Sequence, residues 1–303
     1  MPKRIDHVIV AAADLDQLEA AFTRLGFHVV GGGQHPHLGT RNRIILLSEG
    51  YIELLAIADE QVVSPAVRQR IMTAPGWIGF AVQSVDIAAE ATAMRERGAD
   101  VRGPKPGRLV APSGSARSWH TVTVGGDDLF SVAEPIPFLI QHDSSGDQHQ
   151  SELAGADAIG PHPNGASRLQ SVVVAVENLA DTAGAFAEAY GLIPSVEPFK
   201  CQDLGATTVV LALDDVDEQI MLAQPEGAGI AADRLANAGE GVCCVAVAVD
   251  DIAATRRYLE NGGIRFMPSE ESLFIPAEGT GGAPLMFVRD DEGGGDTRGS
   301  SVS

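Results

Sequence analysis

The densest group of chemically useful side chains lies in residues 35–42, with the sequence HPHLGTRN. Two imidazoles flank a proline, and the planar guanidinium that follows can hold a carboxylate through two hydrogen bonds. The segment therefore predicts substrate binding in a loop just before a strand. The imidazoles would alternatively complete a metal shell, or the segment is only an ordered turn with satisfied backbone groups. The candidate substrate-binding residues are His35, His37, Thr40, Arg41 and Asn42.

A single carboxyl group interrupts the apolar strand-like run YIELLAI, at Glu53. Burying a carboxylate is costly unless a partner satisfies it. One interpretation pairs Glu53 with a nearby arginine such as Arg41. The other makes it a catalytic general base that takes a proton from a carbon next to a carbonyl.

Net charge and cysteine usage narrow the class of partner. The formal net charge is −20, from 41 acidic and 21 basic residues, and such a field repels phosphate backbones and anionic lipid surfaces. We therefore expect no nucleic acid and no membrane partner. Three cysteines without a disulfide framework fit a reducing, cytoplasmic setting. The adjacent Cys243 and Cys244 lie in the run GVCCVAVAV and are expected to be inert core residues.

An internal repeat organises the chain. Four segments begin with an apolar run, reach an Asp or Asn, and continue in a helical pattern to a glycine 12 or 13 residues later. Asp or Asn at that place caps a helix N-terminus, and glycine adopts the left-handed conformation that ends a helix. The four pairs are Asp14 and Gly26, Asp86 and Gly98, Asn178 and Gly191, and Asp251 and Gly263.

Each repeat has the pattern of a βαβββ unit. In the first one, the helix should bury a stripe of Leu15, Leu18, Phe22 and Leu25, and strand-like runs follow at 27–30, 43–47 and 51–57. One such sheet cannot cover its own apolar face, whereas two paired units enclose a concave pocket. The predicted fold class is α+β, with four βαβββ modules paired into two domains. A doubly wound sheet is disfavoured because one helix serves several strands.

The spacing of the repeats predicts the domain boundaries. The four Asp or Asn markers stand 72, 92 and 73 residues apart, and the long middle step contains a segment rich in Gly, Ser, Asp and Gln. We therefore predict domains at 1–143 and 168–289, separated by a linker at 144–167. Residues 290–303 have almost no apolar side chains and are predicted to be disordered.

The first domain resembles a known family. Residues 5–33 (IDHVIVAAADLDQLEAAFTRLGFHVVGGG), 35–57 (HPHLGTRNRIILLSEGYIELLAI) and 137–143 (PFLIQHD) are similar to glyoxalase-like domains of the vicinal oxygen chelate superfamily. That superfamily includes glyoxalase I, bleomycin-resistance proteins and extradiol dioxygenases. The resemblance covers about the first 143 residues, and the second half is similar only through the repeat.

The resemblance also implies a metal centre. In the superfamily, a metal ion lies in the cup of paired units, held from the first and last strands of each unit. The matching positions here give His7, Glu53 and Gln141 as ligands of a divalent Zn, Ni, Fe or Mn ion, with Gly79 at the fourth place. Two places thus depart from the His or Glu of active members. The alternative for His7 is a strand histidine in a polar pocket without metal.

The resemblance implies a small-molecule enzyme of lyase, isomerase or oxygenase type, acting on a substrate with vicinal oxygens. Glu53 would be its ligand or base. The alternative function is a bleomycin-resistance-type protein that binds or sequesters a ligand without turnover, and a third is an inactive scaffold; a homodimer is left open. The second half carries Ser171, Cys244 and Ile220 at the site positions. We therefore expect it to be a metal-free partner of the first.

Overall fold

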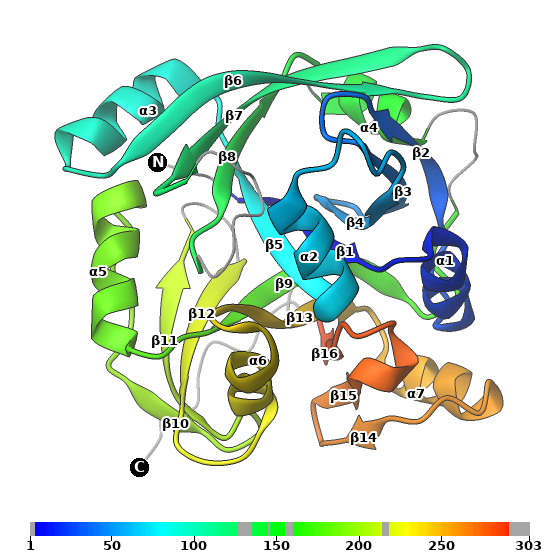
Figure 1. Cartoon of the computed structure of the whole chain (residues 1–303). Coiled ribbons are helices and arrows are strands. Elements are labelled where there is room, and N and C mark those ends of the chain that lie inside the picture. The colour runs from blue at the N-terminus through cyan, green and yellow to red at the C-terminus, as the bar shows by residue number, and fades with distance from the viewer. Residues whose placement is uncertain (1–3, 127–134, 145, 155–159, 214–217, 291–303) are drawn as a thin grey trace.

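The computed structural model describes residues 4–126, 135–144, 146–154, 160–213 and 218–290. The first half of the chain forms a closed eight-stranded barrel, and the second half forms an open eight-stranded sheet. Helices cover the outside of both (Figure 1). The predicted α+β class with two paired-module domains is confirmed.

The strand order follows the repeat. Within each module, the first and last strands run parallel, and the first strands of the two paired modules run antiparallel beside each other. The barrel order is β1 Ile5–Ala11, β4 Tyr51–Ile57, β3 Thr40–Leu46, β2 Val30–His35, β6 Val101–Val110, β7 Ala116–Val124, β8 Phe138–His142 and β5 Gly76–Gln83. The open sheet has the order β10 Phe199–Cys201, β11 Ala206–Ala212, β12 Gln219–Pro225, β9 Ala166–Ala175, β13 Gly241–Val249, β16 Leu285–Arg289, β15 Ser272–Ile275 and β14 Met267–Pro268.

The helices begin and end where the sequence predicts. All four Asp or Asn markers are N-caps whose side chains accept hydrogen bonds from first-turn N–H groups. All four paired glycines have positive φ angles. The apolar stripe of the first helix is fully buried. The helices are α1 Leu15–Arg24, α2 Pro65–Thr73, α3 Ile87–Glu96, α4 Gly146–Ala154, α5 Leu179–Tyr190, α6 Ile230–Ala238, α7 Ile252–Asn261 and the 3₁₀ helix η1 Ala277–Gly279.

Some local bounds differ from the prediction. The strand expected at 27–30 starts only at Val30. In the segment 35–42, residues 36–39 form the predicted loop before a strand, while His35 ends β2 and residues 40–42 begin β3. Part of the segment predicted as a linker, 144–167, forms α4, whose Leu153 packs on Tyr51 and Ile44 of the barrel. Of the predicted tail, only Asp290 lies within the described residues, where it pairs with Arg168.

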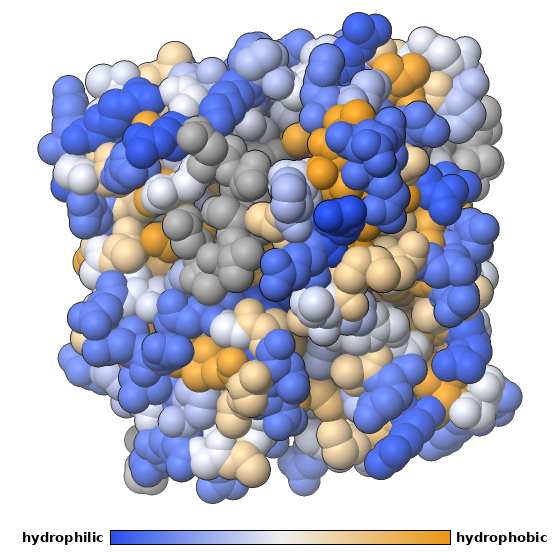
Figure 2. All heavy atoms as spheres, viewed as in Figure 1, coloured by the Kyte–Doolittle hydropathy of each residue, from blue (hydrophilic) through white to orange (hydrophobic). Residues whose placement is uncertain are grey.

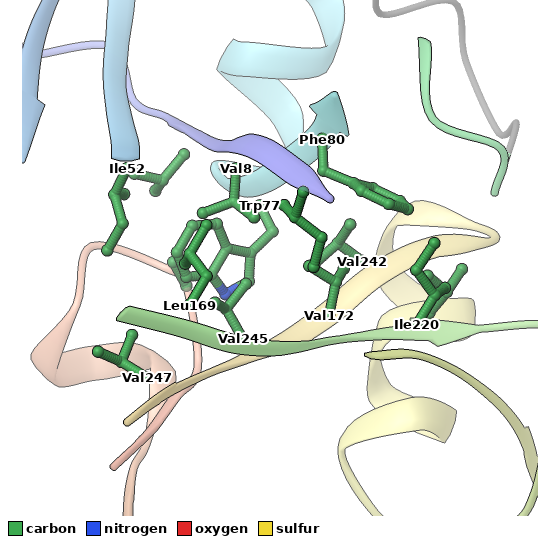
Figure 3. Packing of buried hydrophobic residues seen from close by; sticks show 14 of the residues in the cluster. Val8, Ile52, Trp77, Phe80, Leu169, Val172, Ile220, Val242, Val245 and Val247 are labelled. Carbon is green, nitrogen blue, oxygen red and sulfur yellow. The ribbon is translucent and has the colours of Figure 1, made fainter. Parts of the chain in front are cut away.

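One continuous apolar core joins the two domains. Val8 and Phe80 on the outside of the barrel pack with Leu169, Val172 and Val245 of the open sheet (Figure 3). Residues of both domains therefore share one buried apolar cluster, which favours their association. No helix in the described part of the chain is long and apolar enough to cross a membrane.

A buried carboxyl group lies at this junction. Glu218, at the start of β12, is 1% exposed. One oxygen accepts a 2.5 Å hydrogen bond from the Ile5 N–H, and the other has no partner among the described residues. Burial raises the pKa of Glu218 from 4.5 to about 7. Ionising this carboxyl therefore opposes folding, so stability is lost as the pH rises from about 4.5 through 7.

We expect Glu218→Gln to remove this pH dependence. The variant should gain stability relative to the wild type between pH 5 and pH 8, by at most about 3 kcal/mol, because each pKa unit is worth about 1.4 kcal/mol. Urea unfolding at both pH values measures the difference. The exposed Glu197→Gln serves as control. Equal pH dependence in wild type and Glu218→Gln would contradict the prediction.

Candidate functional site

The barrel encloses a cavity of about 50 Å³. Alternate residues of each strand point inward, as the two-residue period of a strand requires. On β4, for example, Tyr51, Glu53 and Leu55 line the cavity, while Ile52 and Leu54 face the opposite side. The polar or charged lining residues are His7, His35, Thr40, Asn42, Tyr51, Glu53, Arg117 and His142, and the remaining lining is apolar or aromatic.

Glu53 is held in place from one side. It is 6% exposed, and its Oε1 accepts a 2.6 Å hydrogen bond from Asn42 Nδ2. Asn42 is oriented in turn, because its Oδ1 accepts from the Gly33 N–H at 2.9 Å. In the described part of the chain, the second carboxyl oxygen, Oε2, has no such bond, and it lies 3.7 Å from His7 Nε2. This oxygen is the one available to a substrate.

His7 is backed by a carboxylate that strand alternation would not place there. Asp6 and His7 are neighbours on β1, yet the Asp6 Oδ1 and His7 Nδ1 atoms are 2.7 Å apart. The pairing of β1 with β5 shifts by one residue between Ile5 and His7, which marks a β-bulge. The bulge lets both side chains meet. The His7 ring is also stacked on Tyr51, with ring centres 4.6 Å apart.

Asp6 also binds a second imidazole. His142 Nε2, from the end of β8, lies 3.2 Å from the same Asp6 oxygen. Burial alone would raise the pKa of Asp6, but the charges and hydrogen bonds of His142 and His7 outweigh it and hold the pKa well below its usual range. Asp6 is therefore ionised and accepts from the Nδ1–H of His7. With Nδ1 engaged by Asp6, Nε2 is the ring nitrogen that faces Glu53.

A helix adds one more ring to this network. His149 of α4 lies over His142, with ring centres 3.9 Å apart. Burial, with the nearby His142, lowers the pKa of His149 to about 4. His149 is thus neutral at physiological pH. The segment that looked like a linker therefore supports the cavity wall.

His35 lies on the other side of Glu53. Its Nε2 is 3.7 Å from Glu53 Oε1, and its Nδ1 is 2.9 Å from Thr40 Oγ1. Burial lowers the pKa of His35, more than the nearby Glu53 raises it. Trp119 packs edge-on against the ring at 5.8 Å. Glu53 is thus flanked by two imidazoles in a largely apolar cavity.

Only part of the predicted substrate-binding set reaches the cavity. His35, Thr40 and Asn42 line it, whereas Arg41 points to the other face of β3 and His37 is exposed in the hairpin turn. The structure therefore does not bring Arg41 and His37 into this cavity, because alternation along β3 turns Arg41 outward and His37 lies in the exposed turn.

The structure also brings in residues that sequence reasoning missed. Arg117 of β7 lines the cavity without an ion pair within the described residues, and His142 lines it from β8. Arg117 shares its strand face with Trp119, so strand alternation is the signal that would have found it. Asp6 contacts His7 from outside the cavity, and strand alternation could not have identified it.

Gln141 does not converge with His7 and Glu53. Its Oε1 accepts a 2.8 Å hydrogen bond from the Ile87 N–H at the start of α3, outside the barrel. Phe138, Ile140 and His142 occupy the inward face of β8 instead. Gln224 of the open sheet does the same for α5, accepting from the Leu179 N–H at 2.8 Å. The assignment of Gln141 as a ligand is wrong; it caps a helix.

We therefore expect Gln141→Ala to cost stability. Loss of this hydrogen bond should lower the free energy of unfolding by about 1 kcal/mol, and Gln224→Ala should cost a similar amount. Urea unfolding measures both. A Gln141→Ala variant of unchanged stability with lowered metal content would contradict the capping role.

The residues do not fit the family's metal centre. Of the four positions implied by the resemblance, His7 and Glu53 face the cavity, Gly79 has no side chain, and Gln141 is turned away. In the described ranges, no group of three or more His, Cys, Asp or Glu side chains has an arrangement that could hold a metal ion. We therefore assign the chemistry below to side chains.

The open sheet has its own concavity, of about 580 Å³. Ser171 and Cys244 line it, as the repeat predicts, together with Met221 and Met286. Burial raises the pKa of Cys244 well above its usual value and that of Cys243 to about 12. Both thiols therefore stay protonated, as expected of inert core cysteines.

Comparisons with known proteins agree with this architecture. The sequence profile described as "Glyoxalase-like domain" matches residues 5–190, and that of the "Glyoxalase/Bleomycin resistance protein/Dioxygenase superfamily" matches residues 170–281. An ethylmalonyl-CoA/methylmalonyl-CoA epimerase from Cereibacter sphaeroides is 29% identical over 124 residues, which are 40% of this chain and 87% of the relative.

Two solved structures share the whole fold. A hypothetical protein from Staphylococcus aureus matches 94% of this chain and 99% of its own, with a TM-score of 0.65 and 16% identity. A mutant of 4-hydroxymandelate synthase from Streptomyces coelicolor matches 96% of this chain and 93% of its own, with a TM-score of 0.66 and 18% identity. At these identities the likeness concerns the fold alone. The chain therefore belongs to the glyoxalase-like domain family of the vicinal oxygen chelate superfamily.

Proposed function

We propose that this protein is an enzyme that removes a proton from a carbon next to a carbonyl group of a small substrate, with Glu53 as the general base. The observation that carries the proposal is the convergence of Glu53, His7 and His35 in one buried cavity, with Asp6 behind His7. The epimerase relative from Cereibacter sphaeroides, named for two acyl-CoA substrates, supports chemistry of this type.

Each side chain has a separate task in this reaction. The Oε2 atom of Glu53 takes the proton, the C–H electron pair moves toward the carbonyl, and an enolate forms. The guanidinium of Arg117 stabilises the charge on the enolate oxygen. His7 Nε2 then accepts the proton from Glu53, and ionised Asp6 stabilises the resulting imidazolium. Returning a proton to the carbon completes an isomerisation or epimerisation.

Cavity size limits the reacting part of the substrate. A volume of about 50 Å³ corresponds to a few water molecules. A short acyl or 2-oxo acid group fits, and a larger carrier would remain outside the barrel. Aromatic neighbours such as Trp119 and Phe138 exclude water around the reacting carbon.

Solvent exchange tests the proposal. The purified protein is incubated in D₂O with pyruvate, 2-oxobutyrate or methylmalonyl-CoA, and NMR follows the loss of the hydrogen next to the carbonyl. We expect enzyme-dependent exchange with at least one probe, abolished in Glu53→Gln. Saturable binding of probes without any exchange would overturn the enzyme proposal and favour the sequestering alternative.

A further inference from the structure

A second cavity, of about 560 Å³, lies between the two domains. Helices α2 and α6 form its sides, and residues 274–284 close it. Both helices lie on the face shown in Figure 1, and hydrophilic residues cover most of this face in Figure 2. The cavity shares no lining residue with the barrel cavity. Exposed Thr73 and Asn237 line its rim, so solutes can reach it.

Each domain contributes one arginine to this cavity from an equivalent place. Helix α2 joins the two modules of the barrel, and α6 joins the two modules of the open sheet. Arg70 on α2 donates to the Trp77 carbonyl at 2.8 Å. Arg234 on α6 donates to the Glu240 carbonyl at 2.9 Å and the Ala238 carbonyl at 3.2 Å. Both guanidiniums are thus fixed against the start of the following strand.

Neither guanidinium has its full set of acceptors. Within the described residues, Arg70 Nη1 and Arg234 Nε are buried without a hydrogen-bond partner, and neither arginine forms an ion pair. Asp233 and Glu278 also line the cavity, but both are exposed. Two buried donors on adjacent cations are costly unless an anion satisfies them.

The charge of Arg234 acts on Arg70, whereas the pKa of Arg234 is lowered by its burial. Burial, with the charge of Arg234, lowers the pKa of Arg70 to about 10, which still leaves it protonated at neutral pH. The chain as a whole has a net charge of −20. Two cations that line one cavity without an ion pair in the described residues therefore form a local site that attracts an anion.

Glycines make room for this arrangement. Gly241, with a φ of +128°, follows α6, and a Cβ there would lie 2.5 Å from Arg234 Nη2. Gly76 occupies the equivalent place after α2, with a φ of +121°, and a Cβ there would lie 2.1 Å from the Gly282 carbonyl oxygen. Gly241 thus leaves room for Arg234, and Gly76 allows the close approach of the segment that closes the cavity.

We propose that this interdomain cavity binds a small organic dianion of the dicarboxylate class. One carboxylate pairs with Arg70 and the other with Arg234, each through the planar donor set that arginine offers. The carbon chain between them packs on the apolar walls formed by Trp77, Val242 and Phe274. Because each domain supplies one arginine, the ligand bridges the domains.

Thermal unfolding with succinate tests this site. At constant ionic strength set with sodium chloride, succinate should raise the Tm of the wild type. Arg70→Met and Arg234→Met should each weaken succinate binding about tenfold or more, as calorimetric titration measures. The exposed Arg68→Met on α2 is the matched control and should bind like the wild type.

Three further variants keep the outcome decisive. If a Met variant fails to fold, Arg70→Lys and Arg234→Lys keep the charge and the aliphatic stem but lose the planar donors, and they should also bind succinate more weakly. Glu53→Gln, in the barrel cavity, should bind succinate like the wild type, so this proposal and the proposed function fail separately. No Tm shift beyond sodium chloride, or equal affinity in the arginine variants, would overturn the site.

Discussion

Glu53→Gln should lower kcat for the exchange reaction by at least about 10²-fold, the lower range for loss of a general base. Glutamine has nearly the shape of glutamate, and its carbonyl oxygen can still accept the 2.6 Å hydrogen bond from Asn42 Nδ2. The cavity should therefore keep its form while its base is lost. KM should change little, because substrate binding does not depend on the proton transfer.

Steady-state kinetics with the best exchange probe measures this effect. Glu60→Gln, at an exposed carboxylate that pairs with Arg68 on the surface, is the control and should retain full activity. Equal kcat in wild type and Glu53→Gln would exclude Glu53 as the base. Circular dichroism at the assay temperature verifies that the variant is folded.

Asp6→Asn should also lower kcat by about 10²-fold, although Asp6 does not line the cavity. The neutral amide no longer stabilises an imidazolium at His7, and its NH₂ group can donate to Nδ1 and reverse the tautomer. Because Asp6 acts through His7, it is a positioning residue, and the pH–rate profile should shift while KM stays nearly constant. Asp16→Asn, exposed on α1, is the control.

The same variant should change the pH dependence of stability. The pKa of Asp6 is held below its usual range, so its ionised form stabilises the folded state above about pH 4, and this contribution is lost as the pH falls. Asp6→Asn should lack this stabilisation at every pH. If Asp6→Asn were as stable as the wild type at pH 7 and fully active, the Asp6–His7 pair would have no role.

The architecture could be predicted because its signals are local. Helix caps such as Asp14 and Asn178 and helix-ending glycines such as Gly26 and Gly191 act within a few residues of themselves. Their regular spacing therefore identifies the four βαβββ modules without any knowledge of strand pairing. The late start of the strand predicted at 27–30 and the helix α4 depended on tertiary packing, which local patterns do not report.

The site was predicted less well because strand register decides it. Ile9 pairs with Glu53 on β4, and Ala81, the counterpart of Ile9, pairs with Phe138 on β8. Phe138 is therefore the true counterpart of Glu53. Matching Gln141 to Glu53 instead moved the assignment to the outer face, because an odd shift along a strand reverses every side chain. The bulge that brings Asp6 to His7 has no mark in the local sequence.

The most direct test of the central claim is a crystal structure of Glu53→Gln with the probe that exchanges fastest in the wild type. We predict that the probe lies in the barrel cavity, with its acidic carbon about 3–3.5 Å from the carboxamide of residue 53, the separation expected for a reactive geometry. Its carbonyl oxygen should face Arg117. A probe bound only in the open-sheet concavity or between the domains would contradict the account.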